Sequence, residues 1–304
     1  GGLSGAARKD RYVRPQITNS REGRISIHDG RHPMVEHALK REMFVPNDTE
    51  LNHTDQEMII ITGPNMAGKS TYMRQVAVLT IMAQTGSFIP AKSASFAPVD
   101  RIFTRVGAAD DISTGQSTFM VEMKEVSHIL CNATKNSLIL LDEIGRGTST
   151  YDGMSIARAV VEYLNSKVHA YTLFATHYHE LSDMAAENEH IKNYAVPVKE
   201  RGKEITFLRR IVPGSADKSY GIHVARLAGL PESLLKRADE ILEGLEVEGI
   251  KEEPAAPVIR RETALNLFSS PIIDELADLD VMSKTPIEAM EILFRLSKEA
   301  KEGR

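Results

Sequence analysis

Runs of continuous apolar residues alternate along the chain with longer segments in which apolar residues recur at helical spacing. The apolar runs occupy residues 58–61, 137–143 and 171–176. Their length and β-branched content predict strands buried on both faces of a parallel sheet. The helical segments occupy residues 72–85, 117–130 and 153–165. This alternation predicts an α/β fold with a mostly parallel sheet flanked by helices.

Weaker patterns predict shorter strands around this frame. The candidates lie at 12–17, 24–27, 94–99 and 101–106. Prolines limit the pairing of the last two, so we expect them at sheet edges. Residues 30–33 predict a turn, and residues 194–196 and 205–208, with Gly202 between them, predict a hairpin.

Two further helices are predicted at 219–229 and 231–246, and Pro231 suits the first position of the second one. Its apolar stripe is either core or a partner surface: Leu234, Leu235, Ala238, Ile241, Leu242 and Leu245. We expect five parts: a flexible leader (1–10), a main domain (11–214), a helical element (215–247), a linker (248–258) and a small helical module (259–304).

Composition narrows the class of protein. Of 304 residues, 42% are hydrophobic and the net charge is −5. No apolar run approaches the roughly 20 residues of a membrane span, and residues 1–7 lack the apolar stretch of a signal peptide. The single cysteine, Cys131, is expected in the core of a cytoplasmic protein. The acidic balance argues against strong nucleic-acid binding by this chain alone.

A glycine-rich stretch between the first apolar run and the first helical segment carries the clearest chemistry. It reads Gly63, Pro64, Asn65, Met66, Ala67, Gly68, Lys69, Ser70 and Thr71. Two glycines with four residues between them, followed by Lys and Ser, match the phosphate-binding loop. The glycines let backbone N–H groups point at phosphate oxygens, Lys69 adds a charge, and the Ser70 hydroxyl can ligate Mg²⁺.

Polar residues at the ends of the other two apolar runs complete this pattern. Asp142 is expected to hold Mg²⁺, and Glu143 to orient the attacking water or take its proton. His177 follows the third run, where it can contact the outermost phosphate, although a lone histidine is more often structural.

Two other candidates stay open on spacing alone. Ser117 begins a predicted helix, where it can contact an anion, but spacing favours a plain N-cap. Phe44 can stack on an adenine ring, but a lone phenylalanine is more often core.

Four stretches occur in the order in which one known family carries them. They read TGPNMAGKST at 62–71, STFMVEM at 117–123, LLDEIGRGTSTYDG at 140–153 and ATHYHEL at 175–181. They closely resemble the ATPase domain of the MutS family of DNA mismatch-repair proteins, which belongs to the ABC-type ATPases. The resemblance covers roughly residues 11–247.

The resemblance implies roles that spacing leaves open. Ser117 would reach across a homodimer to the γ-phosphate of the partner's ATP, and His177 would be the switch histidine that senses the γ-phosphate. Asn65 would be the phosphate-loop asparagine and Phe44 the aromatic residue that packs on adenine. Residues 215–247 would form a helix-turn-helix dimerisation element.

The family also carries mismatch-binding, connector, lever and clamp domains upstream, and nothing in this sequence corresponds to them. We therefore expect a fragment whose contacts with mismatched duplex DNA lie in those absent domains. The resemblance further implies a tetramer through the module at 259–304 and the downstream repair protein MutL as a partner.

We predict an Mg²⁺-dependent ATPase that hydrolyses ATP to ADP and phosphate at composite sites in a homodimer, and so switches a DNA-bound clamp. One alternative is a monomeric phosphate-loop enzyme such as a kinase or GTPase. Another is a binding module whose ATPase is vestigial. A transporter ATPase is disfavoured, because the helix at Ser117 opens with STFMVEM rather than a Leu-Ser-Gly-Gly signature.

Overall fold

The computed structural model describes residues 11–19, 23–39, 43–64, 67–106, 117–201, 204–216 and 220–249. The chain divides into two compact units, and the division falls after Pro231. The second unit begins with helix α8 (Glu232–Gly249), which runs into the stretch expected as a linker. The leader expected at 1–10 and the module expected at 259–304 lie outside the described residues.

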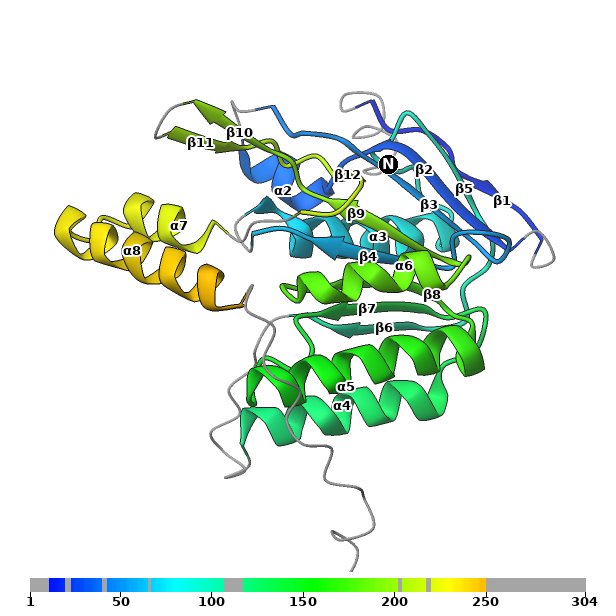
Figure 1. Cartoon of the computed structure of the whole chain (residues 1–304). Helices are drawn as coiled ribbons and strands as arrows, with labels where there is room; N and C mark the ends of the chain where they lie inside the picture. The colour runs from blue at the N-terminus through cyan, green and yellow to red at the C-terminus, as the bar shows by residue number, and fades with distance from the viewer. Residues whose placement is uncertain are drawn as a thin grey trace, which may run out of the picture. The chain divides into compact units, whose positions relative to one another are not determined.

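A six-stranded sheet forms the centre of the first unit (Figure 1). Its order is β12 (Val212–Pro213), β9 (Ile191–Ala195), β4 (Met58–Thr62), β8 (Tyr171–Ala175), β7 (Leu138–Asp142) and β6 (Ile102–Arg105). The strands from β9 to β6 run parallel, and the short edge strand β12 is antiparallel. The three apolar runs are its central strands, so the expectation of an α/β fold is confirmed.

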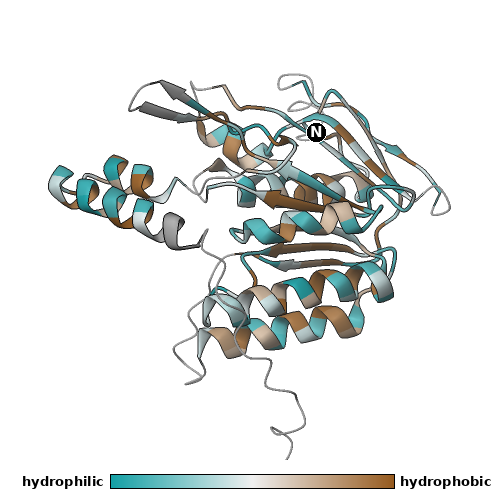
Figure 2. Cartoon of the chain, in the orientation of Figure 1, coloured by the Kyte–Doolittle hydropathy of each residue, from teal (hydrophilic) through white to brown (hydrophobic). Residues whose placement is uncertain are grey.

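Helices cover both faces of this sheet. Ile59 and Ile61 of β4 belong to the core that contains residues of α3 (Lys69–Gln84). Met58 and Ile60 belong to the core that contains residues of α4 (Thr118–Asn132) and α5 (Thr150–Tyr163). Successive strand residues point to opposite faces, so one fully apolar strand serves both cores. Figure 2 shows the central strands in brown between helices with alternating polar and apolar faces.

A second sheet combines three strands that precede β4 in sequence with one strand that follows it. Its order is β1 (Gln16–Ile17), β5 (Ser93–Phe96), β2 (Arg24–Gly30) and β3 (Asn47–Asn52). The strand expected at 12–17 is thus only two residues long. β3 was not predicted, because its sequence is mostly polar. β5 lies inside the sheet, not at its edge as expected, because it ends at Phe96 and Pro98 falls beyond its paired residues.

The expected hairpin is present with a different first strand. β10 (Val198–Arg201) pairs with β11 (Glu204–Phe207) in the antiparallel sense. Residues 194–196 were expected in that position, but Tyr194 and Ala195 belong to β9 and run parallel to β4. The physical reason is burial: a strand beside β4 packs into the core, whereas a two-stranded hairpin buries little.

The remaining helical elements are short. They are α2 (Pro33–Leu39), a π-helical turn at Leu164–Val168, a 3₁₀ segment at His179–Asp183, α6 (Met184–Glu187) and α7 (Gly221–Leu227). The turn expected at 30–33 leads directly into α2, with Pro33 at the first helical position. Within the described ranges, no helix combines the length and apolar character that a membrane crossing needs.

Cys131 corrects one expectation about the core. It was expected to be buried, but it is exposed on α4. The buried residues of that helix are Glu122, Val126 and Ile129. Cys131 lies two positions after Ile129, about 200° around the helix, and therefore faces solvent.

Candidate functional site

Several of the predicted site residues follow neighbouring strands at one edge of the central sheet. β4, β8 and β7 are neighbours and run parallel, so their carboxyl ends lie side by side. Gly63 follows β4 closely, Glu143 follows β7 directly, and His177 follows β8 after one residue. The carboxyl edge of a parallel sheet is where α/β proteins place their ligands.

The glycine stretch forms the connection from β4 to α3. Gly63 has φ 123° and Gly68 has φ 95°, both in the region that favours glycine. Gly68 is the N-cap of α3, which begins at Lys69, three residues before the predicted start. At a helix N-terminus the backbone N–H groups point outward, where they suit an anion. Asn65 and Met66 lie outside the described residues.

Lys69 is a buried lysine, with 1% of its surface exposed. Its ammonium Nζ donates a hydrogen bond to the carbonyl oxygen of Gly63. Burial lowers the pKa of Lys69, and the negative charges of Glu143 and Asp142 oppose that effect. The loop therefore holds a positive charge next to its own backbone.

Ser70 and Asp142 are in direct contact. The hydroxyl of Ser70 donates to carboxylate Oδ2 of Asp142 at 2.5 Å. Burial raises the pKa of Asp142, and the hydrogen bond from Ser70 opposes that shift. A hydroxyl and a carboxylate are the hard oxygen ligands that Mg²⁺ prefers, so these two residues fit the ion.

Two protein oxygens alone do not form a complete metal site. Among the described residues, no group of three or more His, Cys, Asp and Glu side chains is arranged to hold a metal ion. Mg²⁺ commonly takes its remaining ligands from substrate phosphates and water. The pair Ser70 and Asp142 therefore suits an ion that arrives with a nucleotide.

Glu143 has an unusual backbone conformation for a residue with a side chain. Its φ is 54°, in the left-handed region. Its N–H donates to the carbonyl of Ala175 on the neighbouring strand at 2.9 Å. Its carboxylate pairs with the guanidinium of Arg146 at 2.5 Å. Arg146 was not among the predicted site residues; it lies in the turn three residues after Glu143.

His177 and Ser117 occupy more exposed positions at this edge. His177 reaches the surface, and partial desolvation lowers its pKa below 6.5, with the charge of Glu143 opposing the shift. Ser117 is exposed and is the N-cap of α4; its hydroxyl accepts a hydrogen bond from the N–H of Met120 at 3.2 Å. The plain N-cap that spacing favoured is present.

Phe44 lines a pocket of about 260 Å³ beside the glycine stretch. The same pocket is lined by Gly68 and Thr71 of that stretch and by Tyr72, Gln75 and Arg209. Phe44 is half-buried here, so it belongs to a cavity wall rather than to the closed core. Arg209 was not among the predicted site residues. In the sequence it is one of two adjacent arginines that follow the predicted hairpin.

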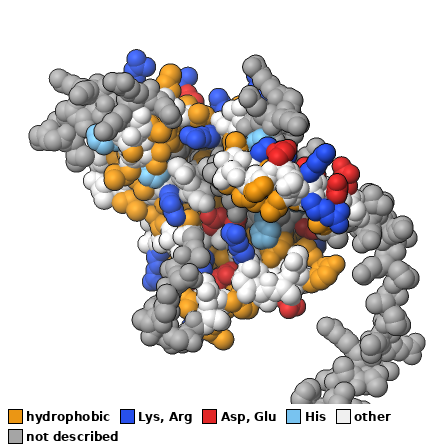
Figure 3. Space-filling view, turned by 90° about the vertical axis from the view of Figure 1, so that its left-hand side faces the viewer, with side chains coloured by type: hydrophobic (Ala, Val, Ile, Leu, Met, Phe, Trp, Pro, Cys, Tyr) orange, Lys and Arg blue, Asp and Glu red, His pale blue; other side chains and the backbone are white. Residues whose placement is uncertain are grey.

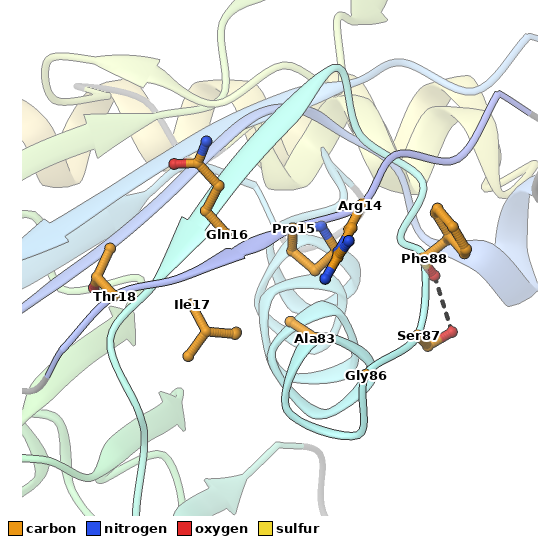
Figure 4. Close-up of a pocket in the computed structure, with 9 residues that line it drawn as sticks. All are labelled: Arg14, Pro15, Gln16, Ile17, Thr18, Ala83, Gly86, Ser87 and Phe88. Atoms are coloured by element: carbon orange, nitrogen blue, oxygen red, sulfur yellow. Dashed lines mark hydrogen bonds between the residues drawn. The ribbon is translucent and has the colours of Figure 1, made fainter.

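A larger hollow lies away from these residues. It has a volume of about 910 Å³ and is lined by residues of β1 and by the turn after α3 (Figure 4). Arg14, Pro15 and Ile17 form one side, and Ala83 and Phe88 form the other. It shares no lining residue with the predicted site.

The described side chains on the face shown in Figure 3 are of mixed charge. Lys and Arg residues lie among Asp, Glu and hydrophobic residues on this face. With a net charge of −5, this mixture differs from the clustered basic surface typical of nucleic-acid-binding domains.

Fold and site together define an α/β protein with a glycine-rich loop, a buried lysine and two adjacent carboxylates at the carboxyl edge of a parallel sheet. The family model described as MutS domain V matches residues 59–246. The match covers more than half of the 304 residues, and the chain belongs to this family.

Several longer proteins named DNA mismatch repair protein MutS are similar to the chain. The protein from Acetivibrio thermocellus is 52% identical over 310 residues, covering 98% of this chain and 35% of that protein. The protein from Caldicellulosiruptor bescii is 56% identical over 299 residues, covering 95% and 34%. The protein from Methanococcoides burtonii is 52% identical over 320 residues, covering 99% and 36%. The chain thus spans about a third of the length of these relatives.

Proposed function

We propose that the chain hydrolyses ATP to ADP and phosphate in an Mg²⁺-dependent reaction, at composite sites between two copies, as part of DNA mismatch repair. The observation that carries this proposal is the contact of Ser70 with Asp142, beside the buried charge of Lys69. A hydroxyl, a carboxylate and a lysine at the start of a helix match what a nucleoside triphosphate with its metal ion requires.

In this proposal the loop at 63–71 holds the phosphates. The N–H groups of the first turn of α3 act as donors to phosphate oxygens, and Lys69 turns its charge from Gly63 to the outer phosphates. Ser70 and Asp142 hold Mg²⁺, which neutralises charge on the phosphates when it is bound.

Hydrolysis depends on Glu143 and His177. Glu143 orients the attacking water and accepts its proton, which requires its carboxylate to leave Arg146. His177 contacts the outermost phosphate as a neutral imidazole, in agreement with its lowered pKa. The pocket beside Phe44 takes the adenine ring, with Phe44 stacking on it.

The second copy supplies the hydroxyl of Ser117. This residue is exposed at the N-terminus of α4, so a partner's γ-phosphate can reach its hydroxyl at the positive end of that helix. Residues 215–247, which include α7 and α8, are proposed as the helix-turn-helix element that joins the copies. The half-exposed residues Leu234, Ile241 and Leu242 of α8 suit a partner surface.

The wider role follows the names of the relatives. We propose that ATP occupancy switches how a clamp holds mismatched duplex DNA, that MutL acts downstream, and that residues 259–304 support a tetramer. Support for this extension is the 52–56% identity to proteins named for DNA mismatch repair.

ATP turnover against protein concentration tests the proposal. Activity per chain is expected to rise with concentration and to saturate when dimers predominate, because each site needs two copies. Glu143→Ala is expected to lower kcat by at least about 10²-fold while ATP binding persists. Glu162→Ala, on the exposed side of α5, serves as the matched control. A flat concentration profile would favour a monomeric enzyme, and binding without any turnover would favour a binding module.

A further inference from the structure

The backbone of Gly145 is held on both sides of its Cα by buried side chains. Its N–H donates to carboxylate Oε1 of Glu122 at 2.7 Å, and its carbonyl accepts from the hydroxyl of Tyr178 at 3.1 Å. Glu122 is 5% exposed and Tyr178 is 4% exposed. Buried hydrogen bonds of this kind fix an orientation, because breaking one leaves a polar group without a partner.

The backbone around Gly145 is too closely packed to accept a side chain at this position. Gly145 has φ 89°, and a Cβ there would lie 2.4 Å from the carbonyl oxygen of Gly153. A Cβ on Gly153 would lie 2.1 Å from the carbonyl oxygen of Gly145 and 2.4 Å from the Tyr178 hydroxyl. The first turn of α5 therefore packs directly, backbone against backbone, on the Gly145 peptide.

Gly145 lies two residues after Glu143. Between them is Ile144, which is 0% exposed. The left-handed conformation of Glu143 is one that a residue with a side chain keeps only when its surroundings impose it. Upstream, the N–H of Glu143 is bound to Ala175; downstream, Glu122 and Tyr178 hold Gly145.

The two side chains that hold Gly145 come from elements that carry other proposed site residues. Glu122 is on α4, whose N-cap is Ser117. Tyr178 follows His177, and the two rings lie 4.2 Å apart, centroid to centroid. The backbone of a single residue, Gly145, is thus bonded to α4, which begins after Ser117, and to the segment that carries His177.

We propose that Glu122 and Tyr178 are positioning residues for ATP hydrolysis, which hold Gly145 so that Glu143 keeps the conformation in which its carboxylate can reach the attacking water. This inference rests on the proposed ATPase function. Neither side chain contacts the nucleotide; both act through the backbone that follows Glu143. A displacement of about 1 Å in a catalytic group can lower a rate about 10²-fold.

The chemistry of the two side chains suits this task. The Glu122 carboxylate is an acceptor, which the N–H of Gly145 requires. Burial raises the pKa of Tyr178, and the negative charge of Glu122 adds to the shift. The phenol therefore remains protonated at neutral pH and serves as the donor that the carbonyl of Gly145 requires.

The test separates kcat from nucleotide affinity in the full chain. Glu122→Ala and Tyr178→Phe are each expected to lower kcat about 10-fold or more, while the Kd for ATP changes less than about 2-fold. Glu122→Gln is expected to recover most of the rate, because its amide oxygen can still accept from Gly145. A merely structural loss of stability would not show this separation or this rescue.

Matched controls come from α4 and α5. Glu125→Ala lies on α4 with its side chain 46% exposed, and Tyr163→Phe lies on α5 with 47% exposure. Both are expected to keep the wild-type kcat. The double variant of Glu122 and Tyr178 is expected to have nearly the same kcat as the slower of the two single variants, since both side chains act on the backbone of Gly145.

Several outcomes would overturn the inference. They are an unchanged kcat in Tyr178→Phe, an ATP Kd that weakens in proportion to the loss of kcat, or no recovery in Glu122→Gln. If Glu122→Ala does not fold, Tyr178→Phe decides the question, because it removes a single oxygen atom. A wild type that shows no turnover would overturn the proposed function itself, whereas an active wild type with equally active variants would overturn this inference alone.

Discussion

At the scale of single residues, the site contains ionisable side chains that are buried or partly buried. Lys69, at 1% exposure, and the partly buried Asp142 have pKa values shifted by burial towards their neutral forms. Charged groups in such surroundings are costly unless they pair, and in this protein they lie next to each other. Perturbed pKa values at the edge of a sheet are typical of functional sites.

Lys69→Met is expected to weaken ATP binding at least about 10-fold, which corresponds to about 1.4 kcal/mol. The substitution keeps most of the length of the side chain and removes the charge that would face the phosphates. The fold is expected to survive, because burial already disfavours the charged form. Equilibrium binding of a nucleotide analogue measures the effect, with the exposed Lys92→Met as control. Unchanged affinity would remove Lys69 from the phosphate site.

His177 is expected to set an acid limit on activity below pH 6.5. Its pKa is lowered, so the imidazole is neutral at pH 7 and takes up a proton only at lower pH. The rate of turnover between pH 5.5 and pH 8 measures this, with His177→Gln expected to lack the transition. An unchanged profile in His177→Gln would assign the limit to another group.

The same shift gives the sign of a stability effect. The unfolded chain binds this proton more readily than the folded one, so stability is lost as the pH falls below 6.5. As the pH falls below 6.5, the wild type is expected to lose more of its free energy of unfolding than His177→Gln does, as measured by urea unfolding.

At the scale of helices and strands, α5 packs closely against the turn after β7. Gly153 lies inside α5, where alanine would ordinarily be more stable than glycine. Here a Cβ would meet the backbone of Gly145, and that backbone is held by Glu122 and Tyr178. A side chain at position 153 would therefore displace the backbone of Gly145.

Gly153→Ala is expected to destabilise the protein by about 1–3 kcal/mol, because the added methyl group overlaps backbone atoms. Gly244→Ala, in α8, where no atom lies within 4 Å, is expected to stabilise its helix by about 0.5–1 kcal/mol. Urea unfolding followed by circular dichroism compares the two. The same sign for both substitutions would contradict the packing of α5 on Gly145.

For the chain as a whole, the proposed composite site predicts complementation between two inactive variants. In an equimolar mixture of Ser117→Ala and Lys69→Met, half of the dimers are mixed, and each mixed dimer has one site free of both substitutions. Activity is expected to recover to about a quarter of the wild-type rate. Steady-state hydrolysis of each variant and of the mixture measures this. No recovery would exclude the role of Ser117 across the dimer.

The local parts of this protein were readable in its residue order. The runs that became β4, β7 and β8 are mostly apolar, and the glycine spacing of 63–68 is a short-range pattern, so both could be recognised without knowledge of their neighbours. Ser117 was likewise expected at a helix start, since a cap bonds within its own turn.

Long-range packing governed the remainder. Tyr194 and Ala195 belong to a strand of the central sheet rather than to the hairpin, because they pair with β4. Glu122 lies in the helix predicted at 117–130 without any local signal of a role; it contacts Gly145, 23 positions away in sequence, in the turn after β7. Burial and hydrogen-bond partners belong to pairs of distant segments, so a pattern along one segment contains no information about them.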